Sequence, residues 1–160
     1  MGEYRPQEQN FSVAGLRFAV VVARWNGQVT EGLLAGVLRA AKQQKMDPDA
    51  LHIYRVPGAF ELPLASQQAA RSGHFDGVIA LGCVIRGDTS HFDYICAETT
   101  RGLGQVGLQE ALPVAFGLLT TDNLEQAVKR SSENSENKGE EAILTMLEML
   151  HTLKNIAGNT

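Results

Sequence analysis

The chain has 160 residues, of which 44% are hydrophobic and 20% charged, with a formal net charge of −4 at pH 7. This length and composition predict one globular domain with a real core. The basic residues are scattered and form no Lys/Arg stripe, which argues against a nucleic-acid-binding surface. The polar residues 1–10 argue against a signal peptide or membrane span there, and Cys83 and Cys96 lack metal-ligand spacing. We therefore expect a cytoplasmic protein with reduced thiols and no membrane partner.

The pattern of apolar residues predicts strands that alternate with helices. Strands are expected at 17–23, 51–56, 77–85 and 113–119. Helices are expected at 28–45, 62–71, 91–109 and 140–157. A short helix is expected from a capping box at 122–125 to about residue 130. The buried face of the last helix is expected to consist of Ile143, Met146, Leu147, Leu150 and Leu153. This alternation predicts an α/β fold, a three-layer αβα sandwich around a four-stranded parallel sheet with right-handed crossovers. The expected organisation is a flexible tail at 1–10, a single domain at 11–157 and a C-terminal tail at 158–160.

Chemically distinctive residues follow the predicted strands, at 24–26, 57–61, 86–91 and 116–117. In open parallel sheets, ligands bind beyond the carboxyl ends of the strands. The third of these turns leads from a strand into the expected start of a helix at Thr89-Ser90. Free backbone N–H groups, which suit an anion, would therefore lie beside the imidazole of His91. This combination predicts an enzyme that acts on a phosphorylated small molecule, and a helix-capping role is the alternative for His91.

Two motifs resemble nucleotide-binding signatures but lack the context that those signatures need. Gly102–Gly107 matches G-x-G-x-x-G letter for letter, yet it lies in the second half of a predicted helix, where small residues favour close helix packing. The stretch 82–89 has the spacing of a P-loop, but Asp88 stands where that loop has its lysine and would repel phosphates. We therefore expect neither dinucleotide binding nor nucleotide hydrolysis.

Several side chains allow two interpretations. Trp25 fits either the core or a stacking position against a planar ring. Glu61, close to Pro63, fits either a helix N-terminus or contact with a polyol or ring. Arg130 and Lys138 flank a polar loop and would, by themselves, more often be surface charges. The remaining histidines are expected to be structural or solvated: His52, His74 and His151.

Five motifs make the chain resemble the lumazine synthase family from about Phe11 to Ala157. They are Arg24-Trp-Asn26, Val56-Pro-Gly-Ala-Phe-Glu-Leu-Pro63, Ala80-Leu-Gly-Cys-Val-Ile-Arg-Gly-Asp-Thr-Ser-His-Phe-Asp-Tyr94, Pro113-Val-Ala-Phe-Gly117 and Asn137-Lys-Gly-x-Glu-Ala142. Their order and separations match the family. The resemblance implies a flavodoxin-like fold, and we also expect an N-terminal strand to be added to the sheet of a neighbouring subunit.

The resemblance further implies a transferase of riboflavin biosynthesis. It would condense 5-amino-6-(D-ribitylamino)uracil with 3,4-dihydroxy-2-butanone 4-phosphate, without a metal or organic cofactor. The products would be 6,7-dimethyl-8-ribityllumazine, phosphate and water, in the penultimate step of the pathway. A non-catalytic flavin- or riboflavin-binding protein and an inactive shell-forming protein on the same scaffold are the alternatives.

Roles for individual residues follow from the same resemblance. His91 would donate and accept protons. The pyrimidine and its ribityl chain would contact Trp25, Ala59, Phe60, Glu61, the backbone of Cys83, Val84 and Ile85, and Phe116. The butanone phosphate would contact Asp88, Thr89, Arg130 and Lys138.

The family also implies active sites between adjacent subunits of a pentamer, with Phe116 and Arg130 supplied by the neighbour. A decamer or a 60-subunit shell is an alternative to the pentamer that the sequence leaves open, and an association with riboflavin synthase is a further expectation. One departure from the family pattern lies between Arg130 and Asn137. The family usually has a small-residue, basic tract there, whereas this chain has the acidic run Arg130-Ser-Ser-Glu-Asn-Ser-Glu136.

Overall fold

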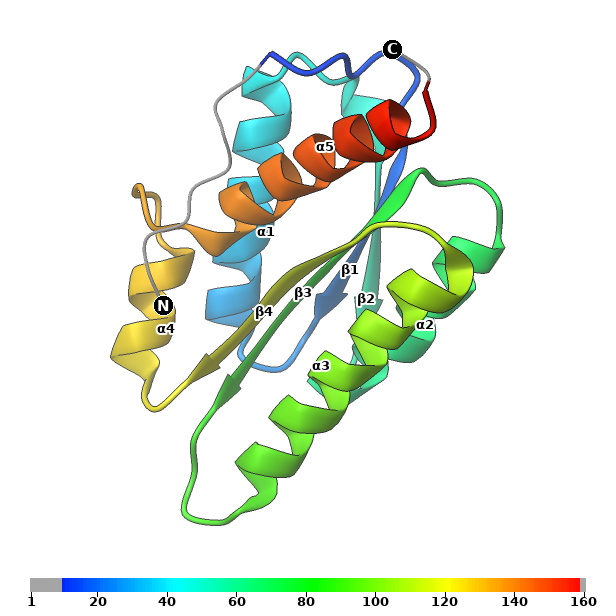
Figure 1. Cartoon of the computed structure of the whole chain (residues 1–160). Helices are drawn as coiled ribbons and strands as arrows, with labels where there is room; N and C mark the ends of the chain where they lie inside the picture. Colours follow the sequence, from blue (N-terminus) through cyan, green and yellow to red (C-terminus); the bar gives the residue numbers. More distant parts are fainter. Residues whose placement is uncertain (1–9, 159–160) are drawn as a thin grey trace.

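The computed structural model describes residues 10–158. The strands of this part are β1 (Phe18–Ala23), β2 (Leu51–Val56), β3 (Gly77–Ile85) and β4 (Val114–Thr121). They form one parallel sheet in the order β2-β1-β3-β4. The helices are α1 (Gly27–Gln43), α2 (Leu62–Arg71), α3 (His91–Glu110), α4 (Leu124–Ser131) and α5 (Lys138–Ile156), with 3₁₀ turns at Pro48–Ala50 and Ala59–Glu61 (Figure 1).

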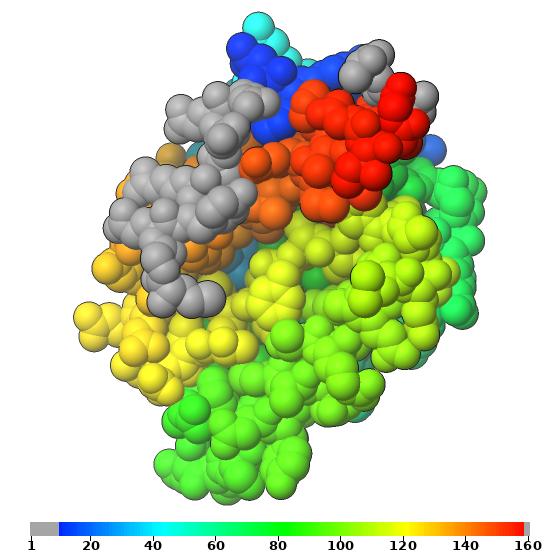
Figure 2. Space-filling model, viewed as in Figure 1, coloured from blue at the N-terminus to red at the C-terminus, as the bar shows by residue number. Residues whose placement is uncertain are grey.

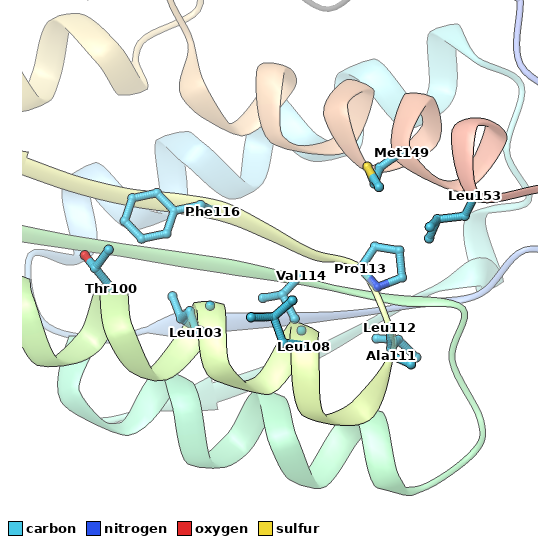
Figure 3. Close-up of a pocket in the computed structure, with 12 residues that line it drawn as sticks. Thr100, Leu103, Leu108, Ala111, Leu112, Pro113, Val114, Phe116, Met149 and Leu153 are labelled. Atoms are coloured by element: carbon cyan, nitrogen blue, oxygen red, sulfur yellow. The ribbon is translucent and has the colours of Figure 1, made fainter. Parts of the chain in front are cut away.

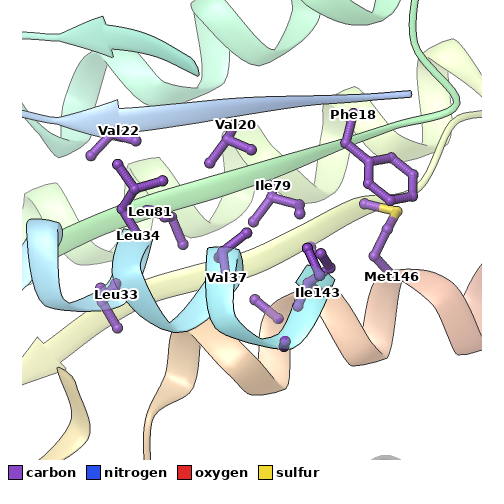
Figure 4. Packing of buried hydrophobic residues seen from close by; sticks show 14 of the residues in the cluster. Phe18, Val20, Val22, Leu33, Leu34, Val37, Ile79, Leu81, Ile143 and Met146 are labelled. Carbon is purple, nitrogen blue, oxygen red and sulfur yellow. The ribbon is translucent and has the colours of Figure 1, made fainter. Parts of the chain in front are cut away.

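Helices cover both faces of the sheet, with α1, α4 and α5 on one face and α2 and α3 on the other (Figure 1). Successive residues of β1 supply both cores, because side chains alternate along a strand. Phe18, Val20 and Val22 pack under α1 and α5, as Figure 4 shows, whereas Ala19 and Val21 pack toward α2 and α3. The three-layer α/β fold predicted from the sequence is therefore confirmed.

The start of α4 differs from the predicted capping box. Asn123, and not Asp122, is the N-cap residue, and its side chain accepts a hydrogen bond of 2.9 Å from the Gln126 N–H. The Asp122 carboxylate instead accepts from the Arg86 guanidinium at 3.0 Å. The turn before α4 is therefore tied to the end of β3.

The last helix also differs from the prediction, at both ends. It begins at Lys138 because the Asn137 side chain accepts hydrogen bonds from two N–H groups of its first turn. Near its other end, Leu153 was expected in the core but is 37% exposed. That side chain lies in a surface hollow that is described below.

The two edges of the sheet are β2 and β4, each paired with a single strand in the described chain. The predicted addition of an N-terminal strand to a neighbouring sheet stays a prediction. Most of the two predicted tails, residues 1–9 and 159–160, lies outside the described residues.

Candidate functional site

The turns after β1 and β2 lie side by side at the carboxyl edge of the sheet. The backbone continues to pair beyond the strands, because the Arg24 N–H donates to Val56 O (2.8 Å) and the Trp25 N–H to Pro57 O (3.0 Å). The Trp25 ring lies against Gly58, where a Cβ atom would be 2.5 Å from ring atom Cε3. Glycine is therefore required at this position for the ring to lie where it does. The Trp25 side chain is 68% exposed, which excludes the core interpretation.

Asn26 connects the first turn to β3. It adopts the left-handed conformation (φ 57°), which asparagine tolerates better than most residues. Its Nδ2 donates to the carbonyl oxygen of Cys83 at 2.9 Å. Burial, and then the charge of Cys96, raises the pKa of the Cys83 thiol to about 11. The Cys83 thiol is therefore a poor nucleophile near neutral pH.

The turn after β2 contains the 3₁₀ residues Ala59–Glu61. Ala59 is buried and the Phe60 ring is 58% exposed, so the ring is available at the surface of the single chain. Glu61 Oε2 accepts a hydrogen bond from the Gly58 N–H at 2.9 Å. The local structural role considered for Glu61 is thus present, and its contact with a ligand stays a prediction.

The β3–α3 loop, residues 86–90, carries the predicted phosphate ligands and leads into His91. Asp88, Thr89 and His91 are all exposed. The N-cap of α3 is Ser90, whose side chain makes no capping hydrogen bond, while the His91 N–H donates weakly to Thr89 Oγ1 at 3.4 Å. The first turn of a 20-residue helix therefore faces outward beside the imidazole. This arrangement suits an anion.

A second group of predicted site residues lies beside the β4 edge. Phe116, Arg130 and Lys138 line a hollow of about 530 Å³ between β4, α4 and α5. Arg130 donates from its guanidinium to the Gln126 carbonyl oxygen at 2.9 Å, and Lys138 forms an ion pair with Glu141. None of the residues at 83–91 lines this hollow. The structure thus brings the predicted residues together in two groups.

The acidic residues of the α4–α5 connection lie close to basic side chains. Glu133 lies 4.0 Å from Arg39, and Glu136 lies 3.3 Å from Lys129. Neither glutamate lines the hollow that contains Arg130. Their charges are therefore partly balanced outside the predicted phosphate site.

A third feature is an apolar hollow of about 550 Å³ between α3, β4 and α5. In Figure 2 the yellow-green atoms of β4 lie at the bottom of the depression between these helices. Figure 3 shows that Phe116, Leu108, Met149 and Leu153 reach into it from three different elements. Leu108 is 87% exposed, an unusual position for such a large apolar side chain unless another surface covers it. Phe116 lines both this hollow and the one that contains Arg130.

Two residues of the site region received no role from the sequence. Asn26 was part of a motif, but its bond to Cys83 joins positions 57 residues apart and has no local signal. Gln126 lines the hollow with Arg130 and accepts its hydrogen bond. Because the acceptor is the backbone carbonyl oxygen of Gln126, the identity of residue 126 gave no signal for this contact.

Within residues 10–158, no group of three or more His, Cys, Asp or Glu side chains is placed to hold a metal ion. The helices of the same part are all too short or too polar to cross a membrane.

Comparison with known proteins agrees with the motifs. The family model for 6,7-dimethyl-8-ribityllumazine synthase matches residues 15–154. A 6,7-dimethyl-8-ribityllumazine synthase of Chlorobium phaeobacteroides (strain DSM 266 / SMG 266 / 2430) is 49% identical over 144 residues, which cover 90% of this chain and 93% of the relative. A protein of the same name from Desulfovibrio desulfuricans (strain ATCC 27774 / DSM 6949 / MB) is 46% identical over 142 residues, which cover 89% and 91%.

Proposed function

The chain belongs to the 6,7-dimethyl-8-ribityllumazine synthase family, and we propose that its two groups of site residues are complementary halves of one active site. The enzyme condenses 5-amino-6-(D-ribitylamino)uracil with 3,4-dihydroxy-2-butanone 4-phosphate. It forms 6,7-dimethyl-8-ribityllumazine, phosphate and water, the penultimate step of riboflavin biosynthesis. The observation that carries the proposal for the site is that Trp25, Phe60 and His91 are exposed on the segments that follow the adjacent strands β1, β2 and β3.

The first half would bind the pyrimidine. The exposed rings of Trp25 and Phe60 are suited to stacking on a planar heterocycle. Glu61 uses one carboxylate oxygen for the Gly58 N–H, which leaves the other oxygen to accept from a ribityl hydroxyl. Ala59 and the backbone of residues 83–85 would complete the contacts at the adjoining strand ends.

The reaction needs no nucleophile from the protein, because the amine of the uracil attacks the ketone carbon itself. Holding two substrates in one orientation can replace up to about 7–11 kcal/mol of the barrier. Asp88, Thr89 and the outward-facing first turn of α3 would hold the phosphate beside His91. His91 would transfer protons as water leaves to form the imine, as phosphate is eliminated, and as the second amine closes the ring with loss of a second water. Such proton transfer typically contributes about 10²–10⁴-fold.

The second half would come from a neighbouring copy. The open β4 edge, with Arg130 and Lys138 in one hollow and exposed apolar side chains in the next, supports this arrangement. A copy seated there would cover Leu108 and bring its own β3–α3 loop toward Arg130 and Phe116. We propose a pentamer built from such contacts, with decamers or 60-subunit shells and association with riboflavin synthase as further assemblies. The two free cysteines support a cytoplasmic location.

Mixing two impaired variants tests the shared site. His91→Ala and Arg130→Ala subunits are dissociated, mixed and reassembled, and the formation of 6,7-dimethyl-8-ribityllumazine is followed by its fluorescence. If the two residues come from different subunits, some sites in the mixture combine both intact halves. The mixture should then exceed both parent variants in activity.

Each variant reassembled alone is the control, and co-purification through an affinity tag on one of the two variants checks that mixed particles form. Activity equal to the mean of the two parents, in particles shown to be mixed, would contradict a site shared between subunits.

A further inference from the structure

We propose that Arg86 is a positioning residue that holds the β3–α3 loop and links it to α4. The inference rests on the proposed function, because Arg86 would act through His91 and Arg130. It begins at the backbone, where the Arg86 N–H donates to Thr121 O at 2.9 Å. Arg86 is thereby fixed at the point where β3 and β4 end together, since Ile85 pairs with Thr121.

The guanidinium of Arg86 holds the first turn of α3 by two contacts. One nitrogen donates to Asp93 Oδ1 at 3.2 Å, and Cζ lies 4.3 Å from the centroid of the Phe92 ring. Phe92 and Asp93 directly follow His91, and Phe92 is only 9% exposed. Ser90 provides no capping bond, and these two contacts of Arg86 tie the start of the helix to the end of β3.

The same guanidinium reaches the turn before α4. Its Nε donates to Asp122 Oδ1 at 3.0 Å, a bond that is the main cause of the raised pKa of Arg86. The Asp122 N–H donates to Gln126 Oε1 at 2.9 Å, and the carbonyl oxygen of Gln126 accepts from Arg130, also at 2.9 Å. A continuous series of hydrogen bonds therefore runs from the loop before His91 to Arg130.

These contacts affect the position of the β3–α3 loop more than the stability of the fold. The side chains of Arg86, Asp93 and Asp122 are 45%, 60% and 66% exposed in the single chain. Ion pairs at such exposure contribute little to the free energy of unfolding. A shift of the loop by about 1 Å can nevertheless cost up to about 10²-fold in rate. Lysine would be a poor replacement, because only the planar fork of arginine can reach two carboxylates and stack on a ring at once.

The arrangement has a consequence for neighbouring sites. In the proposed assembly, His91 of one chain serves one site and Arg130 of the same chain serves the next. Arg86 touches the elements that carry both. Loss of Arg86 should therefore lower kcat/KM for the butanone phosphate, which would contact Arg130 and lie beside His91. Binding of the pyrimidine should be almost unchanged.

The test compares Arg86→Met and Arg86→Lys with Arg101→Met, which removes an exposed ion pair with Glu98 elsewhere on α3. For Arg86→Met we expect kcat/KM for the butanone phosphate to fall about ten- to hundredfold. The KM for the pyrimidine and the thermal midpoint should stay close to those of Arg101→Met. Arg86→Lys should recover only part of the loss. An unchanged kcat/KM in Arg86→Met, or an equal loss for both substrates with a lowered midpoint, would overturn the inference.

A double-mutant cycle separates this inference from the proposed function. If Arg86 acts through Arg130, then Arg86→Met in an Arg130→Ala background should cost clearly less than Arg86→Met alone. If the fold-losses in kcat/KM of the two single variants multiply in the double variant, Arg86 acts independently of Arg130, and the link to α4 would be overturned. Full activity of Arg130→Ala itself would instead refute the proposed phosphate site, while the effect of Arg86→Met on its own would still decide whether the loop is positioned by Arg86.

Discussion

Arg130 and Lys138 share a hollow but differ in the charge that already faces each of them. Arg130 donates to a neutral carbonyl oxygen, whereas Lys138 is paired with the carboxylate of Glu141. A phosphate that binds Lys138 must compete with Glu141, and one that binds Arg130 competes only with Gln126 O. Arg130 is therefore expected to contribute more to phosphate affinity.

Replacement of Arg130 by alanine should raise the KM for the butanone phosphate roughly ten- to hundredfold, since a charge-assisted hydrogen bond contributes about 1.5–3 kcal/mol. Lys138→Ala should have a smaller effect. Steady-state kinetics with each substrate varied in turn provides the measurement. The KM for the pyrimidine is the internal control, and an equal rise in both constants would show that Arg130 supports an interface instead.

The Cys83 thiol makes the free energy of unfolding depend on pH in the alkaline range. Burial raises its pKa from the ordinary 9.0 to about 11, so the folded chain retains the proton that the unfolded chain releases. This contribution is fully present below pH 9 and is lost as the pH rises to about 11. The difference in unfolding free energy between the wild type and Cys83→Ala should therefore shrink between these values. Urea unfolding of both proteins at pH 8 to 11 measures it, and a constant difference would contradict the prediction.

At the scale of elements, Asn137 fixes the connection between α4 and α5. Its Nδ2 donates to the carbonyl oxygens of Gly32, Ser131 and Ser132 at 3.2, 2.9 and 3.0 Å. Its Oδ1 accepts from two N–H groups at the start of α5. Asn137 is 3% exposed, and a Cβ atom at Gly36 of α1 would lie 2.1 Å from its Oδ1. The side chain thus joins three helices in a space that leaves no room for a larger neighbour.

The substitution Asn137→Asp should destabilise the chain by about 3 kcal/mol or more, because a carboxylate oxygen would face three carbonyl oxygens in a buried position. Asn134→Asp is the matched control, since Asn134 lies in the same connection but is exposed. It should change stability by less than about 1 kcal/mol. Chemical denaturation measures the free energy of unfolding of both variants. Similar losses of stability would show that the buried hydrogen bonds of Asn137 contribute no more than those of the exposed Asn134.

The elements themselves were largely predictable, and the contacts between them were not. The limits of β2 and β3 were predicted correctly from short segments with apolar residues that turn residues follow, which is a local pattern. The predicted start of α4 was wrong by one residue, because the Asp122 carboxylate accepts a hydrogen bond from Arg86, which is 36 residues away in the sequence. The bond from Asn137 to Gly32 spans 105 residues and has no local signal either. The site residues came from motifs, and their contacts with substrates stay predictions.

At the scale of the whole molecule, apolar side chains of α3, β4 and α5 remain exposed around a single hollow. Leu153 illustrates why the sequence alone was misleading. Its helical spacing places it with the core residues of α5, but Leu153 lines the hollow between α3, β4 and α5. Periodicity identifies an apolar face and cannot tell whether this chain or another one covers it.

Leu108→Lys should weaken self-association, because burial of a leucine contributes about 1.5–3 kcal/mol at each contact and a buried ammonium adds a further cost. Size-exclusion chromatography with light scattering should show smaller species at micromolar concentration. Gln109→Lys introduces the same charge at the next position of α3, outside the hollow, and is the matched control. Unchanged particle mass in Leu108→Lys would show that another surface mediates assembly.

The direction of the strands also determines where an added protein could be attached. The proposed chemistry lies beyond the carboxyl ends of the strands, whereas α5 runs back to the opposite edge, where the Phe11 ring lies 6.3 Å from that of His151 (Figure 1). A fluorescent protein or an antigen fused after Gly158 would therefore start at the edge remote from substrate entry. In an assembly of many copies, such a fusion would display its cargo in multiple copies without obstructing turnover.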